Sequence, residues 1–432
     1  HSFGDTCYNG LVFNKNQIMK NVIAKLILLF VIMFVSVKVY ADDFCVGGIY
    51  YEVVSFSDLT CEVTSGTEKY AGDIVIPETV VYKGQTFTVM SIGRSAFFYC
   101  PNLTSVNIPN TVISIGDDAF MECSGLTSID IPSSVVSIGE GTFADCRSLT
   151  KIDIPNSVTS IGRSAFAGCR SLTKIGIPNS VTSISDGMFS ACGFTSFDIP
   201  NSVTSIGENA FSGCYSLVSI NIPNSVTSIG LGAFVACVNL ASVVIPNSVT
   251  SIGNGAFSSC SSLMSVVIPN SVTSIGESAF SGCRSLMSVV IPNSISEIGY
   301  SVFDVCKSLT SVVIPSSVRK IDVTAFSGCY NLKKVVIEDG NEILRVACKY
   351  CSGSSSGRGL FYDCPVKTLY LGRNVSCENS PFENTTTLAD VTIGSMVTDV
   401  ESIYWDKNEN LAVLKLLSMT PPSTRDFSGK QY

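Results

Sequence analysis

The sequence predicts a repeat solenoid that is mainly β, in which coils of 23 residues stack behind an N-terminal β-hairpin cap. Two regularities predict this fold. The stretch IPNSVTSIG occurs five times letter for letter, beginning at Ile154, Ile199, Ile222, Ile245 and Ile268. Prolines recur with a step of 23 residues and a single step of 22, at Pro109, Pro132, Pro155, Pro178, Pro200, Pro223, Pro246, Pro269, Pro292 and Pro315. A fixed period of this length indicates stacked units rather than separate globules, because identical coils present the same surface to their neighbours.

Each coil is expected to contain two short strands with apolar residues facing inward. In one coil the inward set is Leu263, Val266 and Ile268 in the first strand and Val272 and Ile275 in the second. Pro269 lacks the N–H that a longer strand would need, so it ends the first strand. No coil can bury this interior alone, so the coils must stack.

The end of each coil is expected to be one turn of helix. Gly276 permits the turn after the second strand. The spacing of Ala279, Phe280 and Cys283 suits a helical turn that covers the hydrophobic interior. The expected coil therefore has two short strands and one helical turn.

The consensus LxxVxIPxSVxxIGxxAFxxC resembles the BspA-type leucine-rich repeats of bacterial, Bacteroides-like surface proteins. The resemblance is specific, because eleven coils start in register, at Leu103, Leu126, Leu149, Leu172, Phe194, Leu217, Leu240, Leu263, Leu286, Leu309 and Leu332. The coil at Phe194 departs from it, because one residue is missing before it. The resemblance implies right-handed leucine-rich-repeat coils, and it implies adhesion to host matrix proteins, host cells or other bacteria.

The chain is expected to divide into seven segments. They are residues 1–18 (translated upstream sequence), 19–41 (signal peptide), 42–82 (N-terminal β cap), 83–339 (regular leucine-rich repeat solenoid), 340–359 (an insertion with a Ser/Gly run), 360–418 (degenerate C-terminal repeats) and 419–432 (start of a truncated segment). The cap and the truncated segment are implied by the resemblance.

A signal peptide is indicated by the order of residues after the first methionine. Met19 is followed by lysines, then by the apolar run from Leu26 to Val37, and then by the small residue Ala41. That run is shorter than the roughly 20 residues that a bilayer span needs. We therefore expect cleavage after Ala41, a secreted or cell-surface location, and no membrane span in the mature protein.

Composition argues against several function classes. The net charge of -8 leaves no basic stripe for nucleic acid. His1 is the only histidine and precedes the expected mature chain, so we expect no catalytic triad, no histidine-ligated metal and no cofactor. Carboxylates remain: Asp130 and Asp153 are expected about 4.8 Å apart on adjacent strands, where calcium could bridge them. Neutralisation by Lys151 and Lys174 is the favoured alternative.

Cysteine is unusually frequent, with 18 residues. Eleven keep the repeat period, at Cys100, Cys123, Cys146, Cys169, Cys192, Cys214, Cys237, Cys260, Cys283, Cys306 and Cys329. Parallel side chains on stacked coils do not reach disulfide geometry, so we expect buried free thiols. Cys45 and Cys61 are expected on neighbouring strands and could form a disulfide. Cys348 and Cys351 form an isolated CxxC, for which a structural bridge is expected, and the redox state of Cys377 stays open.

A candidate binding surface lies on the fifth residue of each first strand, which is expected to face solvent. This position is polar from Asn107 to Asn221 and valine from Val244 onward. The candidate partner-binding residues are Val244, Met264, Val267, Met287, Val290, Val313 and Val336. The alternative is that valine simply suits a strand. A second column, of Thr-Ser pairs from Thr159 to Thr273, suits a hydrated β surface better than ice binding.

The favoured function is therefore adhesion by a non-enzymatic monomer that binds an extracellular protein or glycan. A structural spacer that holds a further C-terminal domain away from the cell is one alternative. A glycosidase with two carboxylates is the other, and it would require a deep acidic cleft, which uniform solenoids rarely form.

Overall fold

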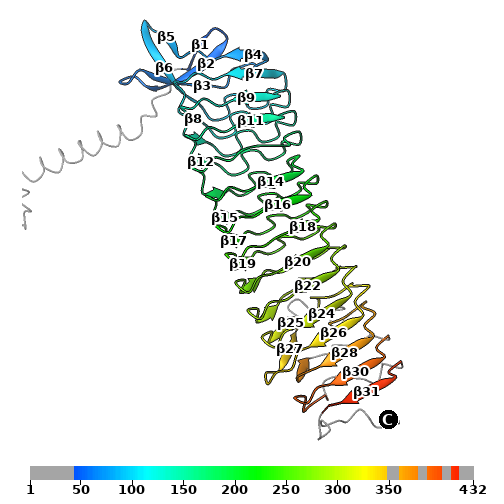
Figure 1. Cartoon of the computed structure of the whole chain (residues 1–432). Coiled ribbons are helices and arrows are strands. Elements are labelled where there is room, and N and C mark those ends of the chain that lie inside the picture. The colour runs from blue at the N-terminus through cyan, green and yellow to red at the C-terminus, as the bar shows by residue number, and fades with distance from the viewer. Residues whose placement is uncertain (1–42, 348–359, 378–386, 401–409, 418–432) are drawn as a thin grey trace, which may run out of the picture.

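The computed structural model is an elongated solenoid with a β cap at its N-terminal end (Figure 1). It describes residues 43–347, 360–377, 387–400 and 410–417. Two ladders of short parallel strands follow the long axis, and most coils contribute one strand to each ladder, although the coil of Leu172 contributes only to the second. The predicted solenoid of short strands with a β cap is confirmed.

The cap consists of five strands: β1 (Asp43–Val46), β2 (Ile49–Ser55), β3 (Thr60–Thr64), β5 (Thr79–Tyr82) and β6 (Gln85–Ile92). β1, β2 and β3 pair antiparallel, and β5 pairs antiparallel with β6. β6 also pairs in parallel with β3 and with the first short strand of the stack. The cap therefore supplies the backbone partners of the first coil.

The first ladder is formed by the first strands of the coils, which precede the proline in the regular coils. They are β4 (Gly72–Val75), β7 (Leu103–Asn107), β9 (Ser128–Asp130), β11 (Lys151–Asp153), β14 (Ser196–Asp198), β16 (Ser219–Asn221), β18 (Ser242–Val243), β20 (Ser265–Val267), β22 (Ser288–Val290), β24 (Ser311–Ile314), β26 (Lys334–Ile337), β28 (Thr368–Leu371), β30 (Asp390–Ile393) and β31 (Val413–Leu416).

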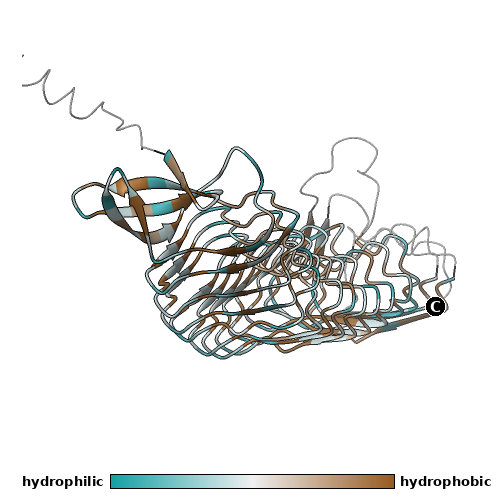
Figure 2. Ribbon diagram, turned by 90° about the horizontal axis from the view of Figure 1, so that it is seen from above, coloured by the Kyte–Doolittle hydropathy of each residue, from teal (hydrophilic) through white to brown (hydrophobic). Residues whose placement is uncertain are grey.

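The second ladder continues from β6. It contains β8 (Ser114–Ile115), β10 (Ser137–Ile138), β12 (Ser160–Ile161), β13 (Ser183–Ile184), β15 (Ser205–Ile206), β17 (Ser228–Ile229), β19 (Ser251–Ile252), β21 (Ser274–Ile275), β23 (Glu297–Ile298), β25 (Lys320–Asp322), β27 (Leu344–Ala347) and β29 (Val375–Cys377). Hydrophobic segments alternate with pale or hydrophilic ones along each coil (Figure 2), as expected for strands with one buried face.

The interior contains a continuous stack of phenylalanine rings. Neighbouring coils place the rings of Phe257 and Phe280 5.4 Å apart and those of Phe280 and Phe303 5.6 Å apart, nearly parallel. In the coil that is one residue short, Phe194 and Phe197 also enter the interior and pack edge-on. The larger rings fill the irregularity left by the missing residue.

The predicted helical turn is wrong, because the described residues contain no helix. The residues around each phenylalanine form stacked turns instead. In the coil of Phe280, Ser278 and Gly282 have φ of 55° and 73°, which an α-helix excludes. The N–H of Phe280 donates to the carbonyl of Val302 in the next coil at 2.9 Å. Alternate donors therefore point along the solenoid axis rather than back into their own coil.

A column of glycines allows the coils to approach closely after the second strand. A Cβ on Gly253 would lie 2.6 Å from the backbone carbon of Gly230. Ser185 occupies the equivalent place in one coil, and its Oγ donates to the carbonyl of Ile161 at 2.7 Å. At this coil the second ladder is interrupted between β12 and β13.

Replacing Gly253 by Ala is expected to destabilise the coils on either side. The methyl group would meet backbone atoms that cannot move aside, at a cost of about 1–3 kcal/mol, and the hydrogen bond from Gly253 N to Ile229 O at 2.9 Å would lengthen. Gly299→Ala is the matched control, because its Cβ would meet nothing closer than 3.9 Å. Urea unfolding measures both variants, and equal loss in the two would contradict the steric explanation.

Candidate partner-binding surface

The first ladder presents its exposed side chains as three columns, which together we call the outer face. One column contains Val218, Ala241, Met264, Met287, Thr310, Lys333 and Lys367. The second contains Ser219, Ser242, Ser265, Ser288, Ser311, Lys334 and Thr368, and the third contains Asn221, Val244, Val267, Val290, Val313, Val336 and Tyr370. The alternation of buried and exposed residues along each strand turns these columns away from the interior.

All seven predicted binding residues lie on the outer face, and we call them the apolar strip. Val244 is 77% exposed, Val267 67% and Val290 60%, whereas Val336 is half-buried. Val267 pairs directly with Val290 across two strands. Met264 and Met287 are in the column alongside, also about half exposed. The strip is thus contiguous, which distinguishes it from the isolated apolar residues common on surfaces.

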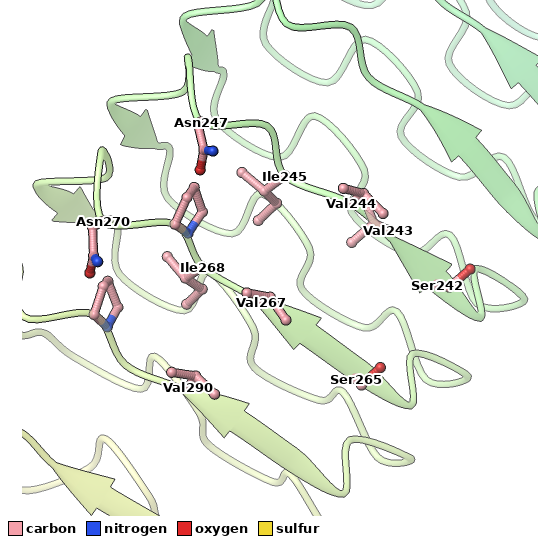
Figure 3. Close-up of a pocket in the computed structure, with 12 residues that line it drawn as sticks. Ser242, Val243, Val244, Ile245, Asn247, Ser265, Val267, Ile268, Asn270 and Val290 are labelled. Carbon is pink, nitrogen blue, oxygen red and sulfur yellow. The ribbon is translucent and has the colours of Figure 1, made fainter.

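A shallow groove of about 530 Å³ follows the strip where each strand meets its proline turn. Val244, Val267 and Val290 lie on successive strands along it, and Asn247 and Asn270 project from the adjacent turns (Figure 3). The floor of the groove is aliphatic, and the exposed carboxamides form one rim. This arrangement can bury apolar groups of a partner and hydrogen-bond its polar groups.

Charge changes sign along the outer face. The coils before the strip carry the exposed carboxylates of Asp130, Asp153 and Asp198, together with the exposed lysines Lys151 and Lys174. The coils at its far end carry Lys333, Lys334 and Lys367, also exposed. A charged partner would therefore be attracted to one end of the strip and repelled from the other.

The paired carboxylates of the sequence do lie on adjacent strands, with Asp130 in register with Asp153. Lys151 forms an ion pair with Asp153 at 2.9 Å, and hydrogen bonding to this carboxylate raises the pKa of Lys151. Lys174 forms no such pair among the residues described. Over the same residues, no group of three or more His, Cys, Asp or Glu side chains is arranged to hold a metal ion.

The cysteine ladder consists of buried free thiols, as predicted. From Cys123 onward each Sγ donates to the carbonyl of the phenylalanine in the preceding coil, as from Cys123 to Phe97 at 3.0 Å and from Cys260 to Phe234 at 3.2 Å. Burial raises the pKa of Cys260 to about 12. The thiols from Cys123 to Cys329 therefore stay protonated at neutral pH and serve as small apolar groups with one weak hydrogen bond. Cys100, in the first coil, is the exception, because a hydrogen bond with Cys123 lowers its pKa to about 7.

The expectation that Cys45 and Cys61 lie on neighbouring strands is wrong. Cys45 is on β1 and Cys61 on β3, and β2 lies between them. Cys45 is exposed and Cys61 is buried, and both are free. Cys348 and Cys351 lie outside the described residues.

The threonine side chains of the column on the second ladder donate hydrogen bonds to backbone carbonyls of the preceding coil. Thr204 Oγ1 donates to the carbonyl of Thr182 at 3.2 Å, and Thr250 Oγ1 donates to that of Thr227 at 3.2 Å. The hydroxyls are therefore partly used within the stack. This supports their interpretation as a hydrated β surface.

Four outer-face residues were missed by the sequence analysis. Lys333 and Lys334 lie in the same coil as Val336, and Lys367 and Tyr370 extend the columns into the next coil. The signal was present in the motif LFYDC after the insertion, in which Phe361 continues the ring stack. Aligning this motif with the regular AFxxC places the following strand, and hence Tyr370, in register with Val336.

Within the described part of the chain, no helix has the length and apolarity to cross a bilayer. The predicted signal peptide lies outside that part.

Solved structures similar to this chain include leucine-rich repeat proteins. One from Bacteroides ovatus is 28% identical with a TM-score of 0.57, covering 80% of this chain and 98% of its own. A leucine-rich cell surface protein from Faecalibacterium prausnitzii is 27% identical with a TM-score of 0.49, covering 85% of this chain and 97% of its own. The pneumococcal vaccine antigen PcpA is 18% identical with a TM-score of 0.54, covering 88% and 99%, and shows the fold alone. Among curated proteins, none matches.

The repeat itself identifies the family. The profile of the BspA type leucine rich repeat region matches residues 90–216, 137–264, 182–309, 252–356 and 310–421 in overlapping copies. The matched segments cover well over half of the sequence and coincide with the stacked coils. The chain therefore belongs to the BspA-type leucine-rich repeat family.

Proposed function

We propose that this chain is an exported surface protein that binds an extracellular protein or glycan through the apolar strip, and that this binding mediates adhesion to host or other cells. The predicted signal peptide and the family support the location. The observation that carries the binding role is the contiguous exposure of Val244, Val267 and Val290 beside a groove. A solenoid that served only as a spacer would have no need of such a surface.

The proposal predicts that charge in the centre of the strip abolishes binding. Changing Val267 and Val290 together to Asp places two like charges on adjacent strands, about 4.8 Å apart. Apolar anchors at the centre of an interface dominate its affinity, so adhesion should fall to background. Both side chains point to solvent, so the interior should stay intact. Adhesion to immobilised extracellular matrix proteins and to intact host cells measures the effect, after circular dichroism confirms the fold.

The matched control changes Asp130 and Asp153 to Ser on the same face, outside the strip, and should leave adhesion nearly unchanged. If the variant with Val267→Asp and Val290→Asp adheres as well as the parent, the valines only stabilise the β-sheet, and the structural-spacer function is favoured. A variant that lacks the coils from Leu240 to Lys333 separates the two functions further, because only a binding surface predicts loss of adhesion by a shortened protein that still folds.

A further inference from the structure

Three lysines converge at the C-terminal end of the apolar strip. Lys333 continues the column of Met264 and Met287, and its N–H donates to the carbonyl of Thr310 at 3.0 Å. The N–H of Lys367 donates to the carbonyl of Lys333 at 2.9 Å. These two side chains therefore start side by side on neighbouring coils.

The third lysine, Lys334, lies two residues before Val336 on β26, and both residues are on the outer side of that strand. The cationic groups and the end of the strip thus share one surface. Val336 in turn pairs with Tyr370 in the next coil. A partner that covers the last valines of the strip must also approach these lysines.

The three lysines differ from Lys151 and Lys320, which form ion pairs, but not from Lys174 and Lys415, which form none among the described residues. Lys151 forms an ion pair with Asp153 at 2.9 Å, and Lys320 pairs with Glu297 at 2.7 Å. Among the described residues, Lys333, Lys334 and Lys367 form no ion pair within 4.0 Å, although Asp390 follows one coil further along the face.

Like charges on adjacent strands are destabilising. The grouping of Lys333 with Lys367 therefore costs stability in the free protein, and carboxylates of a partner would relieve it. At the opposite end of the strip the exposed carboxylate of Asp198 would repel the same partner. The lysines and Asp198 together predict that the charged end of the partner is acidic and that this end lies at the C-terminal end of the strip.

The chemistry of the strip favours a polypeptide over a glycan. Its exposed groups are valine and methionine side chains with proline rings in the groove, and the residues that line the groove include no aromatic ring. The hydroxyls of a sugar ring would lose water against this aliphatic floor, and only the serine and asparagine side chains at its edges could replace those hydrogen bonds, which is costly. Apolar side chains of a polypeptide suit it, while the amides of Asn247 and Asn270 can bond its backbone.

The length of the strip sets the size of the segment. Five valines on successive coils, about 4.8 Å apart, span about 19 Å, which corresponds to about six residues of extended chain. We propose that the outer face binds a polypeptide segment that carries about six largely apolar residues and a cluster of carboxylates. The segment lies along the solenoid axis, with its acidic end over Lys333, Lys334 and Lys367. This inference rests on the proposed binding function and specifies its partner.

The test uses the full-length protein and three labelled synthetic peptides, measured by fluorescence anisotropy. One peptide carries three glutamates before six alternating valine and proline residues, the second has lysines in place of the glutamates, and the third has serines. We expect the protein to prefer the glutamate peptide over the lysine peptide by about tenfold or more at low salt, and the preference to shrink at high salt.

A charge reversal provides the sharper result. The combined variant Lys333→Glu, Lys334→Glu and Lys367→Glu should invert the preference and bind the lysine peptide more tightly. Its control reverses three exposed turn residues away from the outer face, Arg147→Glu, Arg170→Glu and Arg284→Glu. This control has the same net charge and should keep the glutamate preference.

The outcomes separate this inference from the proposed function. The parent protein could bind all three peptides equally and lose this binding in the variant with Val267→Asp and Val290→Asp. That result would support the apolar binding site but would overturn the inference that the partner carries carboxylates. A preference that the lysine variant does not invert, or that the arginine control inverts equally, would also overturn it. Binding of none of the peptides would overturn the inferred polypeptide segment, while the adhesion assay still tests the proposed function.

Discussion

Raising the pH above about 9 is expected to unfold the regular coils steeply, because their cysteines resist ionisation only in the folded state. An ordinary thiol ionises near pH 9.0, whereas burial raises the pKa of Cys146, Cys214 and Cys260 to about 12. The thiols are neutral in both states below pH 9, so their contribution to stability is complete there. Between pH 9 and 12 the unfolded chain releases protons that the folded chain retains, and that stability is lost.

The size of this effect follows from the number of coils that unfold together. Each thiol changes the free energy of unfolding by about 1.4 kcal/mol per pH unit in this range, so a cooperative unit of three coils loses about 4 kcal/mol per unit. Urea unfolding followed by circular dichroism from pH 7 to pH 11 measures the slope. Repeat arrays do not always unfold in one step, so the slope is determined separately for each urea transition.

The control replaces Cys237, Cys260 and Cys283 by Ala. It removes three titrating thiols from adjacent coils and leaves every tyrosine and lysine in place. The slope between pH 9 and 11 should become shallower by about 4 kcal/mol per pH unit if these three coils unfold together. An identical slope in parent and variant would show that the thiols do not govern alkaline unfolding.

Replacing Phe280 by Ala is expected to cost about 3–5 kcal/mol, because it leaves a cavity in a close-packed interior. Phe280 is fully buried between Phe257 and Phe303, and the variant loses both ring contacts. Each coil contacts mainly its neighbours, so the loss should be local. Hydrogen exchange should accelerate in the coils on either side and stay near the parental rate in the cap.

Met264→Ala is the matched control for Phe280, since Met264 belongs to the adjacent strand but is 48% exposed. Its truncation removes little buried surface and should cost below about 1 kcal/mol. Comparable destabilisation by the two substitutions would mean that the phenylalanine stack is not the main source of cohesion between coils.

The sequence was sufficient to predict features that repeat in every coil. The inward set of Leu263, Val266 and Ile268 is buried, and the outward valines are exposed, because period-two alternation directly reflects the two faces of a strand. The column structure of the outer face followed from the same register. The positions on this face could be assigned because, with a constant step, residues one period apart in the sequence are neighbours in space.

Features that depend on contacts between coils were not predictable from one coil. The spacing of Ala279, Phe280 and Cys283 fits a helical turn locally, yet hydrogen bonds to the next coil and left-handed residues at Ser278 and Gly282 produce stacked turns. The prediction that Cys45 and Cys61 lie on neighbouring strands was wrong for a similar reason. The order of cap strands is set by tertiary pairing, and β2 separates them.

Lys367 and Tyr370 were missed because the insertion after residue 339 breaks the constant step, whereas Lys333 and Lys334 precede it in the regular register and could have been assigned from the sequence. Lys367 stands 34 positions after Lys333 in the sequence rather than one period, although their backbones are hydrogen-bonded. Only a structure, or a new alignment anchored on Phe361, restores that adjacency.

The close contact between glycines of successive coils has an evolutionary consequence. Gly230, Gly253 and Gly276 meet their neighbours through nearly the same atoms, so any of these junctions can replace another. The identical stretch IPNSVTSIG is repeated at each junction, which gives recombination a point of exchange at which an entire coil is gained or lost without a mismatched seam. The length of the outer face can therefore change by whole coils, in steps of about 4.8 Å, while the junction between coils stays the same.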